Sequence, residues 1–378
     1  MMSPTRPASP EDGRPRMLIP KKGHGVMVRR TCVIGFALLG SMLSTARGEE
    51  PRGLDVYFID VQGGAATLVV TPQRESVLID SGWPGLNDRD PKRIEHVLKD
   101  VAKLDHLDHL VTTHWHMDHF GGVEGLAKRV RIDHFWDRGL PDPAAPDGDR
   151  AEYPDGPKAD DPLGIAYRKA SEGKRKALKA GDVLPLRGPT QAVVLASGGQ
   201  VIAAPDGPAN PACADAPADL APDPSDNARS IVLRFRLGKF DFLDCGDLTW
   251  NVEKSLVCPT DRVGPIDLFQ VTHHGLAISN HPTLLKTIAP TVAVMNNGPN
   301  KGGDAAAVAL LKSIPSVRAL FQLHKNAATP ASSNTDPALI ANADPQGGRF
   351  VHAAVAADGS RFTVRIGADG PARAFESR

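Results

Sequence analysis

The chain has 378 residues, of which 41% are hydrophobic and 23% are charged, as is typical of a globular protein. Its 44 lysine and arginine residues balance its 44 aspartate and glutamate residues, so no overall positive field exists to draw nucleic acid. The length suits one large domain or two small ones. A phosphate-bearing substrate would therefore have to be held locally, by a metal and a few side chains.

The N-terminus has the composition of an export signal. Residues 1–26 are rich in Pro, Arg and Lys without periodicity, which indicates a disordered or untranslated leader. Residues 27–48 join a positive start, an apolar run and small residues, as secretory signal peptides do. The apolar run is shorter than the roughly 20 residues that span a bilayer. We expect cleavage near Ala46 or Gly48 and a periplasmic or secreted protein, with an uncleaved signal anchor as the alternative.

Export would leave Cys213, Cys245 and Cys258 in an oxidising compartment. Cys213 lies in a loop-like segment and Cys258 directly precedes a proline, whereas Cys245 lies in an apolar strand. We therefore expect a disulfide between Cys213 and Cys258, with Cys245 buried and free.

The first half of the mature chain predicts strands that alternate with helices. Strands are expected at 54–60, 66–71, 76–80, 107–113 and 132–136, and helices after Pro91 and at 123–129. Residues 137–162 are mostly Asp, Pro, Gly, Ala and charged residues and predict a long loop insertion, either a lid or a loose segment. The basic segment 167–179 is expected to be a helix with a solvated face, or alternatively a patch for phosphate or another anion.

The most informative stretch is His114-Trp115-His116-Met117-Asp118-His119. Imidazole and carboxylate groups are the ligands of zinc and related metals. Alternation along an extended segment would place His114 and His116 on one side, and the following Gly-Gly turn would swing Asp118 and His119 toward a second metal. A lone histidine is more often structural, but the full pattern predicts a metal site.

Asp80 ends the third strand beside a serine and a glycine. It would either orient a metal ligand from behind or cap the turn, and the sequence favours neither role.

The second half of the chain predicts further strands and two helices. Strands are expected at 183–186, 191–196, 201–204, 230–237, 240–243, 266–271, 291–295, 317–322, 351–355 and 361–366, and helices at 282–288 and 304–313. A second loop insertion is expected near 205–229. Asp247 follows one apolar strand and the His273-His274 pair follows the next. Strand ends can converge at one edge, so these groups are expected to join the histidine stretch.

A glycine-rich loop after residue 295 carries Asn297 and Lys301. These side chains could present donors to an oxyanion or a phosphate, and a plain turn is the alternative.

The order of these motifs resembles the metallo-β-lactamase superfamily. Together with Asn227-Ala228-Arg229-Ser230, they look like the hydrolase domain of ComEC-type competence proteins and their free-standing exported relatives. The resemblance covers roughly residues 54–325. It implies an α+β fold, a four-layer αββα sandwich with metals at one edge of the two sheets, which we expect to fill a single domain over residues 49–378.

The resemblance also implies a ligand set. His114 and His116 would bind a first metal, Asp118 and His119 would bind a second, and Asp247 would bridge them.

One of His273 and His274 would complete the second metal, and His274 is favoured because it precedes the glycine. No histidine occurs between His134 and His273, so the first metal lacks its third imidazole, and Asp226 or Asn227 stands near the expected place.

The implied protein is an exported hydrolase that uses zinc, as one or two ions, with manganese as an alternative. A metal-activated water would attack the substrate, and Asp118 would orient it and carry a proton to the leaving group. A phosphodiester is the favoured substrate. The alternatives are hydrolysis of a β-lactam, lactone or thioester, or metal-dependent binding of cell-wall or phosphocholine-like ligands without catalysis.

Overall fold

The computed structural model describes residues 52–142, 144 and 152–378. The leader and the signal peptide expected at 1–48 lie outside the described residues. Within the described ranges, no helix is both long and apolar enough to cross a membrane.

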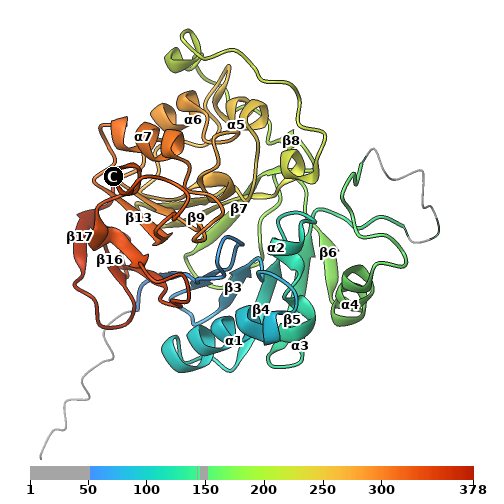
Figure 1. Cartoon of the computed structure of the whole chain (residues 1–378). Coiled ribbons are helices and arrows are strands. Elements are labelled where there is room, and N and C mark those ends of the chain that lie inside the picture. The colour runs from blue at the N-terminus through green and yellow to red at the C-terminus, as the bar shows by residue number, and fades with distance from the viewer. Residues whose placement is uncertain (1–51, 143, 145–151) are drawn as a thin grey trace, which may run out of the picture. The chain divides into compact units, whose positions relative to one another are not determined.

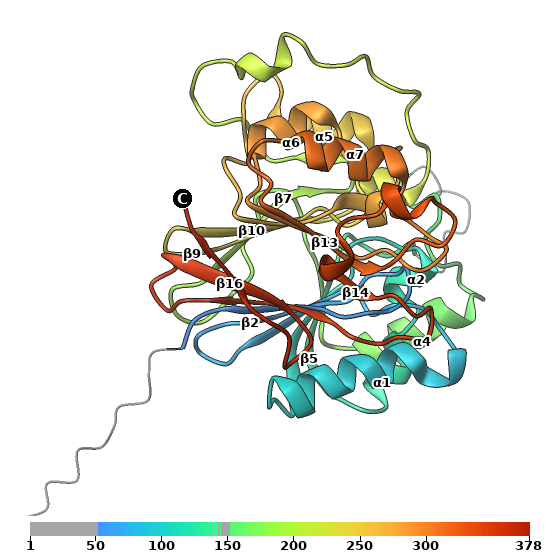
Figure 2. The same ribbon diagram turned by 60° about the vertical axis from the view of Figure 1, so that its left-hand side comes forward.

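Two β-sheets pack face to face (Figures 1 and 2). The first sheet consists of β1 (Asp55–Phe58), β2 (Thr67–Val70), β3 (Ser76–Ile79), β4 (His106–Val111), β5 (Arg131–Asp137), β6 (Arg175–Ala177), β15 (Val351–Val355), β16 (Arg361–Ile366) and β17 (Arg373–Glu376). The second consists of β7 (Gln191–Ser197), β8 (Gln200–Val201), β9 (Val232–Leu237), β10 (Phe240–Asp244), β11 (Leu268–Gln270), β12 (Val292–Met295), β13 (Ala319–His324) and β14 (Ile340–Asn342). Their spatial orders are β17-β16-β15-β1-β2-β3-β4-β5-β6 and β14-β13-β12-β11-β10-β9-β7-β8.

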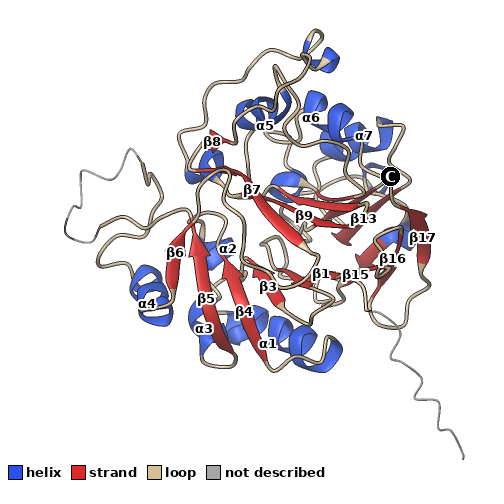
Figure 3. Cartoon of the chain, turned by 180° about the vertical axis from the view of Figure 1, so that it is seen from behind, coloured by secondary structure: helices blue, strands red, loops and turns tan. Residues whose placement is uncertain are grey.

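Helices cover the outer face of each sheet (Figures 2 and 3). The first sheet is covered by α1 (Arg89–His96), α3 (Val123–Ala127) and α4 (Pro162–Ser171), and the second by α5 (Trp250–Val257), α6 (Pro282–Ile288) and α7 (Ala305–Ser313). The short α2 (Met117–Phe120) follows β4. Single turns and a π-helical turn complete the structure: η1 (Leu86–Asp88), η2 (Val97–Val101), η3 (Pro211–Cys213), η4 (Asp226–Arg229), η5 (Thr272–Gly275), η6 (Ala331–Ser333) and η7 (Pro337–Leu339). The predicted αββα sandwich is confirmed.

Alternation along the strands builds the apolar layers. In β1, Val56 and Phe58 face the core between the sheets, whereas Tyr57 faces the outer helices. In β10, Phe242 faces the same inner core and Leu243 faces the helices over the second sheet. A one-residue slip would exchange the two faces, so burial on both sides fixes the register. The polar residues at the strand ends are thereby held in constant positions.

The basic segment differs from the sequence prediction. The helix ends at Ser171, Gly173 adopts a left-handed φ of 72°, and Arg175–Ala177 pairs with β5 as an edge strand. The expected helix over 167–179 is therefore wrong beyond Ser171, because glycine at such a position ends a helix. Arg175 donates to both Asp137 oxygens at 2.6 and 2.7 Å, so its charge is used inside the fold.

Four further segments differ from the sequence prediction. Helix α5 and the short strands β14 and β17 were not expected. Residues 183–186 form an isolated bridge from Val183 to Val193 in place of a strand. Short edge strands depend on a partner strand for their hydrogen bonds, so their local sequence gives little periodic signal.

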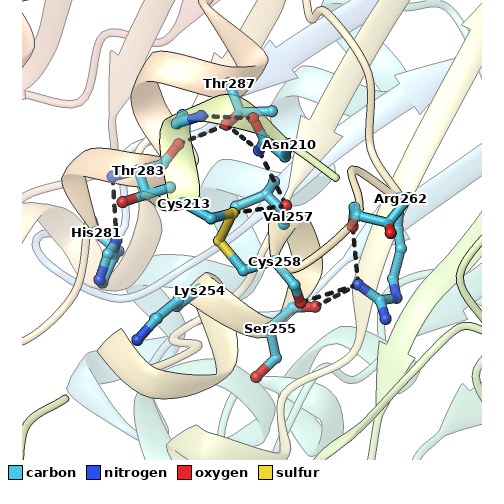
Figure 4. The surroundings of a disulfide bond; sticks show 12 residues. Asn210, Cys213, Lys254, Ser255, Val257, Cys258, Arg262, His281, Thr283 and Thr287 are labelled. Atoms are coloured by element: carbon cyan, nitrogen blue, oxygen red, sulfur yellow. Dashed lines mark hydrogen bonds between the residues drawn. A yellow bond between two sulfur atoms is a disulfide. The ribbon is translucent and has the colours of Figure 1, made fainter. Parts of the chain in front are cut away.

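The disulfide between Cys213 and Cys258 is confirmed, as is a buried, free Cys245 (Figure 4). Beside the disulfide, the Asn210 amide donates to the Val257 carbonyl oxygen at 2.9 Å and to Thr287 Oγ1 at 2.8 Å. These contacts fasten the insertion near 205–229 to α5 and α6.

Removing this disulfide should destabilise the protein. It closes a loop with a sequence separation of 45 residues, and cross-links of that span contribute about 2–4 kcal/mol, chiefly by restricting the unfolded chain. We expect a reducing agent to lower the free energy of unfolding of the wild type by this amount in urea denaturation. The Cys213→Ala/Cys258→Ala double variant should have the free energy of unfolding of the reduced wild type, and the reducing agent should not change it. Equal stability of the oxidised and reduced wild type would contradict the prediction.

Candidate metal centre

The histidine stretch turns as it leaves the first sheet. Strand β4 ends at Val111, and His116 is extended at the N-cap of α2. The helical turn that follows then brings Asp118 and His119 into the interior, where both are buried. The strand thus ends two residues before the expected residue 113, and the expected turn that carries Asp118 and His119 is the helical turn α2. A Cβ atom at Gly122 would lie 2.0 Å from the Ser81 carbonyl oxygen, which explains the glycine in this turn.

Four buried side chains converge at this edge and could hold a metal ion: Asp118, His119, Asp247 and His274. One ligand atom from each lies within 4.8 Å of the others. Asp247 Oδ2 is 3.1 Å from His119 Nε2 and 3.2 Å from His274 Nε2. Asp247 follows β10 and His274 follows β11, and these neighbouring strands are parallel, so both end at the same edge.

Two further imidazoles face the same carboxylate oxygen. His114 Nε2 is 3.9 Å and His273 Nε2 is 3.5 Å from Asp247 Oδ2. The His116 ring centroid is 4.7 Å from that of His114, and its Nε2 is 3.1 Å from Asp155 Oδ2. The structure therefore brings four of the predicted histidines to Asp247, whereas His116 lies beside His114 with its Nε2 on Asp155.

Asp80 orients two of these imidazoles. It accepts hydrogen bonds from His119 Nδ1 at 2.7 Å and from Thr113 Oγ1 at 2.7 Å. Because the Thr113 hydroxyl donates to Asp80, its oxygen accepts the Nδ1–H of His114 at 3.0 Å. Both rings thus turn Nε2 toward Asp247, as metal ligands do. These contacts support the orienting role that the sequence left open.

Buried polar atoms without a partner mark the same place. Among the described residues they include His114 Nε2, Asp247 Oδ1 and Asn227 Oδ1. A buried acceptor left unpaired costs about 1–3 kcal/mol. A divalent cation would engage such nitrogen and oxygen lone pairs, so the donor set fits zinc or a related metal.

The electrostatics keep the carboxylates charged. Burial raises the pKa of Asp118 and of Asp247, but the facing histidines, with His119 foremost, outweigh this effect and hold both pKa values well below the usual range. Burial lowers the pKa of His114 far below its usual value. The ring of His114 is therefore neutral and its Nε2 is free to coordinate.

Two predicted residues do not reach the centre. Asp226 forms a buried ion pair with Arg138 and accepts a hydrogen bond from the Trp115 amide at 2.8 Å. The fully buried Asn297 donates its amide to the carbonyl oxygens of Gly298 at 3.1 Å and His324 at 2.8 Å. Asn297 supports the backbone of its loop and has no amide hydrogen left for a substrate.

Lys301 lies at the rim of the centre. Its ammonium contacts Asp118 and lies 5.1 Å from the centroid of the Trp83 ring. The side chain is about one third exposed. A positive charge therefore stands between the buried ligands and solvent.

A cleft of about 680 Å³ opens beside the centre. Its lining includes His116 and Asp118 together with the apolar side chains Trp83, Met117 and Phe120, and residues 154–158 of the first insertion close another side. Trp83 and Asp155 could not be recognised as site residues from the sequence, because neither lies in a ligand motif. Thr113 could have been suspected from its place directly before the first histidine.

The segment that carries His273 and His274 is tied to α5. Glu253 accepts a hydrogen bond from the His281 backbone amide at 2.8 Å, and His273 Nδ1 is 3.0 Å from Ser279 Oγ. Burial raises the pKa of Glu253 to about 7. This carboxyl group is fully buried and holds the far end of the histidine segment.

The Asp80→Asn variant should bind metal more weakly. The side-chain amide of the variant would place its hydrogens against Thr113 Oγ1 and His119 Nδ1. In the wild type, both of these atoms donate hydrogen bonds to Asp80 Oδ2. Losing such an orienting partner weakens metal binding about 10–100-fold. Competition with a chelating dye measures this, and Asp267→Asn, a buried aspartate at the start of β11, should keep wild-type affinity. Equal metal affinity in the Asp80→Asn variant and the wild type would exclude the orienting role.

Glu253 should make stability depend on pH. In the folded state the Glu253 carboxyl group stays protonated up to about pH 7, whereas in the unfolded chain it loses its proton near pH 4.5. Stability therefore falls as pH rises through that window. Glu253→Gln cannot ionise, and its stability relative to wild type should rise by about 3 kcal/mol between pH 4 and pH 8. Urea unfolding of the metal-free proteins measures this, with the exposed Glu124→Gln as control. A pH-independent difference between the Glu253 variant and wild type would refute it.

Residues 59–199 match the family model described as the Metallo-beta-lactamase superfamily. This segment is less than half of the 378 residues and contains Asp80 and the stretch His114–His119, but neither Asp247 nor the His273-His274 pair. The two-sheet fold is typical of that superfamily. No curated protein matches the sequence.

Several solved structures are similar to the chain. The metallo-beta-lactamase fold protein YhfI from Bacillus subtilis has 11% identity and a TM-score of 0.40, over 71% of this chain and 96% of its own. CmlA, a diiron beta-hydroxylase from Streptomyces venezuelae, has 17% identity and a TM-score of 0.35, over 65% of this chain and 45% of its own. A diphosphatase from the PhnP family has 11% identity and a TM-score of 0.34, over 65% and 87%.

Proposed function

We propose that this protein is an exported, metal-dependent hydrolase of the metallo-β-lactamase superfamily that acts on phosphodiesters, as the motif resemblance to ComEC-type hydrolase domains implies. The observation that carries the proposal is the buried carboxylate of Asp247, which four imidazole nitrogens face within 4 Å. Such a cluster is unfavourable as part of an apolar core and favourable as a ligand set.

The proposed ligands divide between two metal ions. Asp118, His119 and His274 would hold one metal, His114 and His116 would hold a second, and Asp247 would bridge them. A divalent cation bound there would supply Lewis acidity and promote ionisation of a water near neutral pH. Zinc suits the imidazole-rich set, and manganese is the alternative.

The residues of the chain would perform the remaining steps. Asp118, which stays ionised, would orient the attacking water and then carry its proton to the leaving group. Lys301, next to Asp118, would bind the negatively charged phosphoryl oxygens of the substrate and balance the charge that develops on them.

The rim favours an anionic substrate with an apolar group. Lys301 supplies a positive charge at the rim, and Lys158 lines the adjoining cleft, in a chain whose overall charge is zero. The side chains of Trp83, Met117 and Phe120 in the adjoining cleft can pack against an apolar or planar group of the substrate.

Two features support export. The motif at 27–48 is that of a signal peptide. The disulfide between Cys213 and Cys258 is of the kind that persists in an oxidising compartment. We therefore place the reaction in the periplasm or outside the cell, with a small-molecule or phosphodiester substrate as the partner.

Assays of the zinc- or manganese-loaded protein test this function. We expect hydrolysis of bis-nitrophenyl phosphate, and Asp118→Asn should lower its kcat at least 100-fold, in the range typical for loss of an acid–base group. Lys301→Met should raise KM for this anion about 10-fold or more, because a hydrogen bond to a charged group contributes about 1.5–3 kcal/mol. KM for a neutral lactone should not change.

The other outcomes point elsewhere. Faster hydrolysis of nitrocefin or of a lactone than of the phosphodiester would favour the β-lactam or lactone alternative. Metal-loaded protein that is inactive on every substrate would favour a binding protein. Protein that takes up no divalent metal would refute the whole proposal.

A further inference from the structure

We infer that His273 supplies the third imidazole of the first metal, in the place where the chain lacks the expected histidine near Asn227. The inference rests on the proposed function, since it concerns the same centre. It divides the adjacent pair between two metals: His273 would serve the first and His274 the second.

The distances separate the two histidines. His274 Nε2 lies 3.2 Å from Asp118 Oδ2 and 3.3 Å from His119 Nε2, which places it among the ligands of the second metal. His273 Nε2 lies 3.5 Å from Asp247 Oδ2 and from the Asn227 amide nitrogen.

Asn227 marks the first-metal side. Its side chain is buried and its Oδ1 has no partner among the described residues. Asn227 stands where the family pattern would place a histidine. The His273 ring reaches the same place from a loop at the edge of the second sheet. The His114 ring faces the same Asp247 oxygen from the histidine stretch.

The His273 ring is held with a free nitrogen toward the centre. Ser279 Oγ donates to the Leu248 carbonyl oxygen at 2.7 Å, so the Ser279 oxygen accepts the Nδ1–H of His273 at 3.0 Å. The remaining Nε2 is then an acceptor. The Asn227 amide lies 3.5 Å from it, at the outer limit of a hydrogen bond, so this nitrogen is available to a cation.

The backbone explains how neighbouring residues reach two metals. His273 and His274 both adopt a left-handed φ of 55°, which non-glycine residues rarely do. The His273 amide donates to the Gly246 carbonyl oxygen at 3.0 Å, and the His274 carbonyl oxygen accepts from the Gly303 amide at 2.8 Å. These bonds hold a strained turn of the kind found at functional sites, and its two rings stand at 65° to each other, with centroids 6.1 Å apart.

A metal count tests the inference without an activity assay. Wild type and His273→Gln are dialysed against zinc, and bound metal is measured by mass spectrometry, with the absorption of the cobalt-substituted proteins as a second readout. We expect two zinc ions in wild type and one in His273→Gln, with the affinity for the lost ion at least 10-fold lower. Adding Asn227→His to His273→Gln should restore the second ion, because the new ring would stand beside the vacated position.

A matched control separates loss of a ligand from disturbance of the segment. His281 lies in the same segment, and its ring accepts a hydrogen bond from the Thr283 amide at 3.1 Å, which an asparagine can also accept. His281→Asn should therefore keep two ions. Thermal melts of the metal-free proteins should show His273→Gln folded like wild type.

The outcomes distinguish this inference from the proposed function. Two ions bound with wild-type affinity by His273→Gln would overturn the inference, and phosphodiester hydrolysis by the wild type would still support the function. A wild type that binds no divalent metal would overturn both. A cobalt spectrum unchanged by His273→Gln would also count against ligation by His273.

Discussion

The structure depends on the burial of one carboxylate. Asp247 is 2% exposed and has the imidazoles of His114, His119, His273 and His274 around one oxygen. A charge removed from water at this depth needs positive or hydrogen-bonding partners. The centre meets that need by joining groups from both sheets, so it links the two halves of the sandwich as well as forming a site.

Oxygen atoms behind the imidazoles fix their orientation. Asp80 and Thr113 hold two rings on the side of the first sheet, and Ser279 holds His273 on the side of the second. Each of these contacts uses Nδ1 and leaves Nε2 toward the centre. Asp80 follows β3 and Thr113 follows β4, which are parallel neighbours, so the same topology that brings the ligands together also supplies their supports.

The chemistry of the rim comes from less regular parts of the chain. Lys301 belongs to a loop after β12, Trp83 follows β3, and residues 154–158 belong to the first insertion. The layers fix the centre, and these loops shape the cleft around it. Loops carried by a rigid scaffold are where specificity usually resides.

The sequence by itself determined the metal-type motifs, most of the strands and the pairing of Cys213 with Cys258, because these depend on ligand spacing, local periodicity and the position of each cysteine along the chain. The sandwich was implied by the motif resemblance, and the structure confirmed it. The sequence could not show that the basic segment ends its helix at Ser171, nor find the edge strands, whose hydrogen bonds come from distant partners. Only the tertiary structure decided that Asp226 forms an ion pair with Arg138 and that Asn297 supports a loop. It also decided that both His273 and His274 face Asp247. Those roles depend on which strand ends meet at one edge, a property of the sheet order that spacing along the chain does not contain.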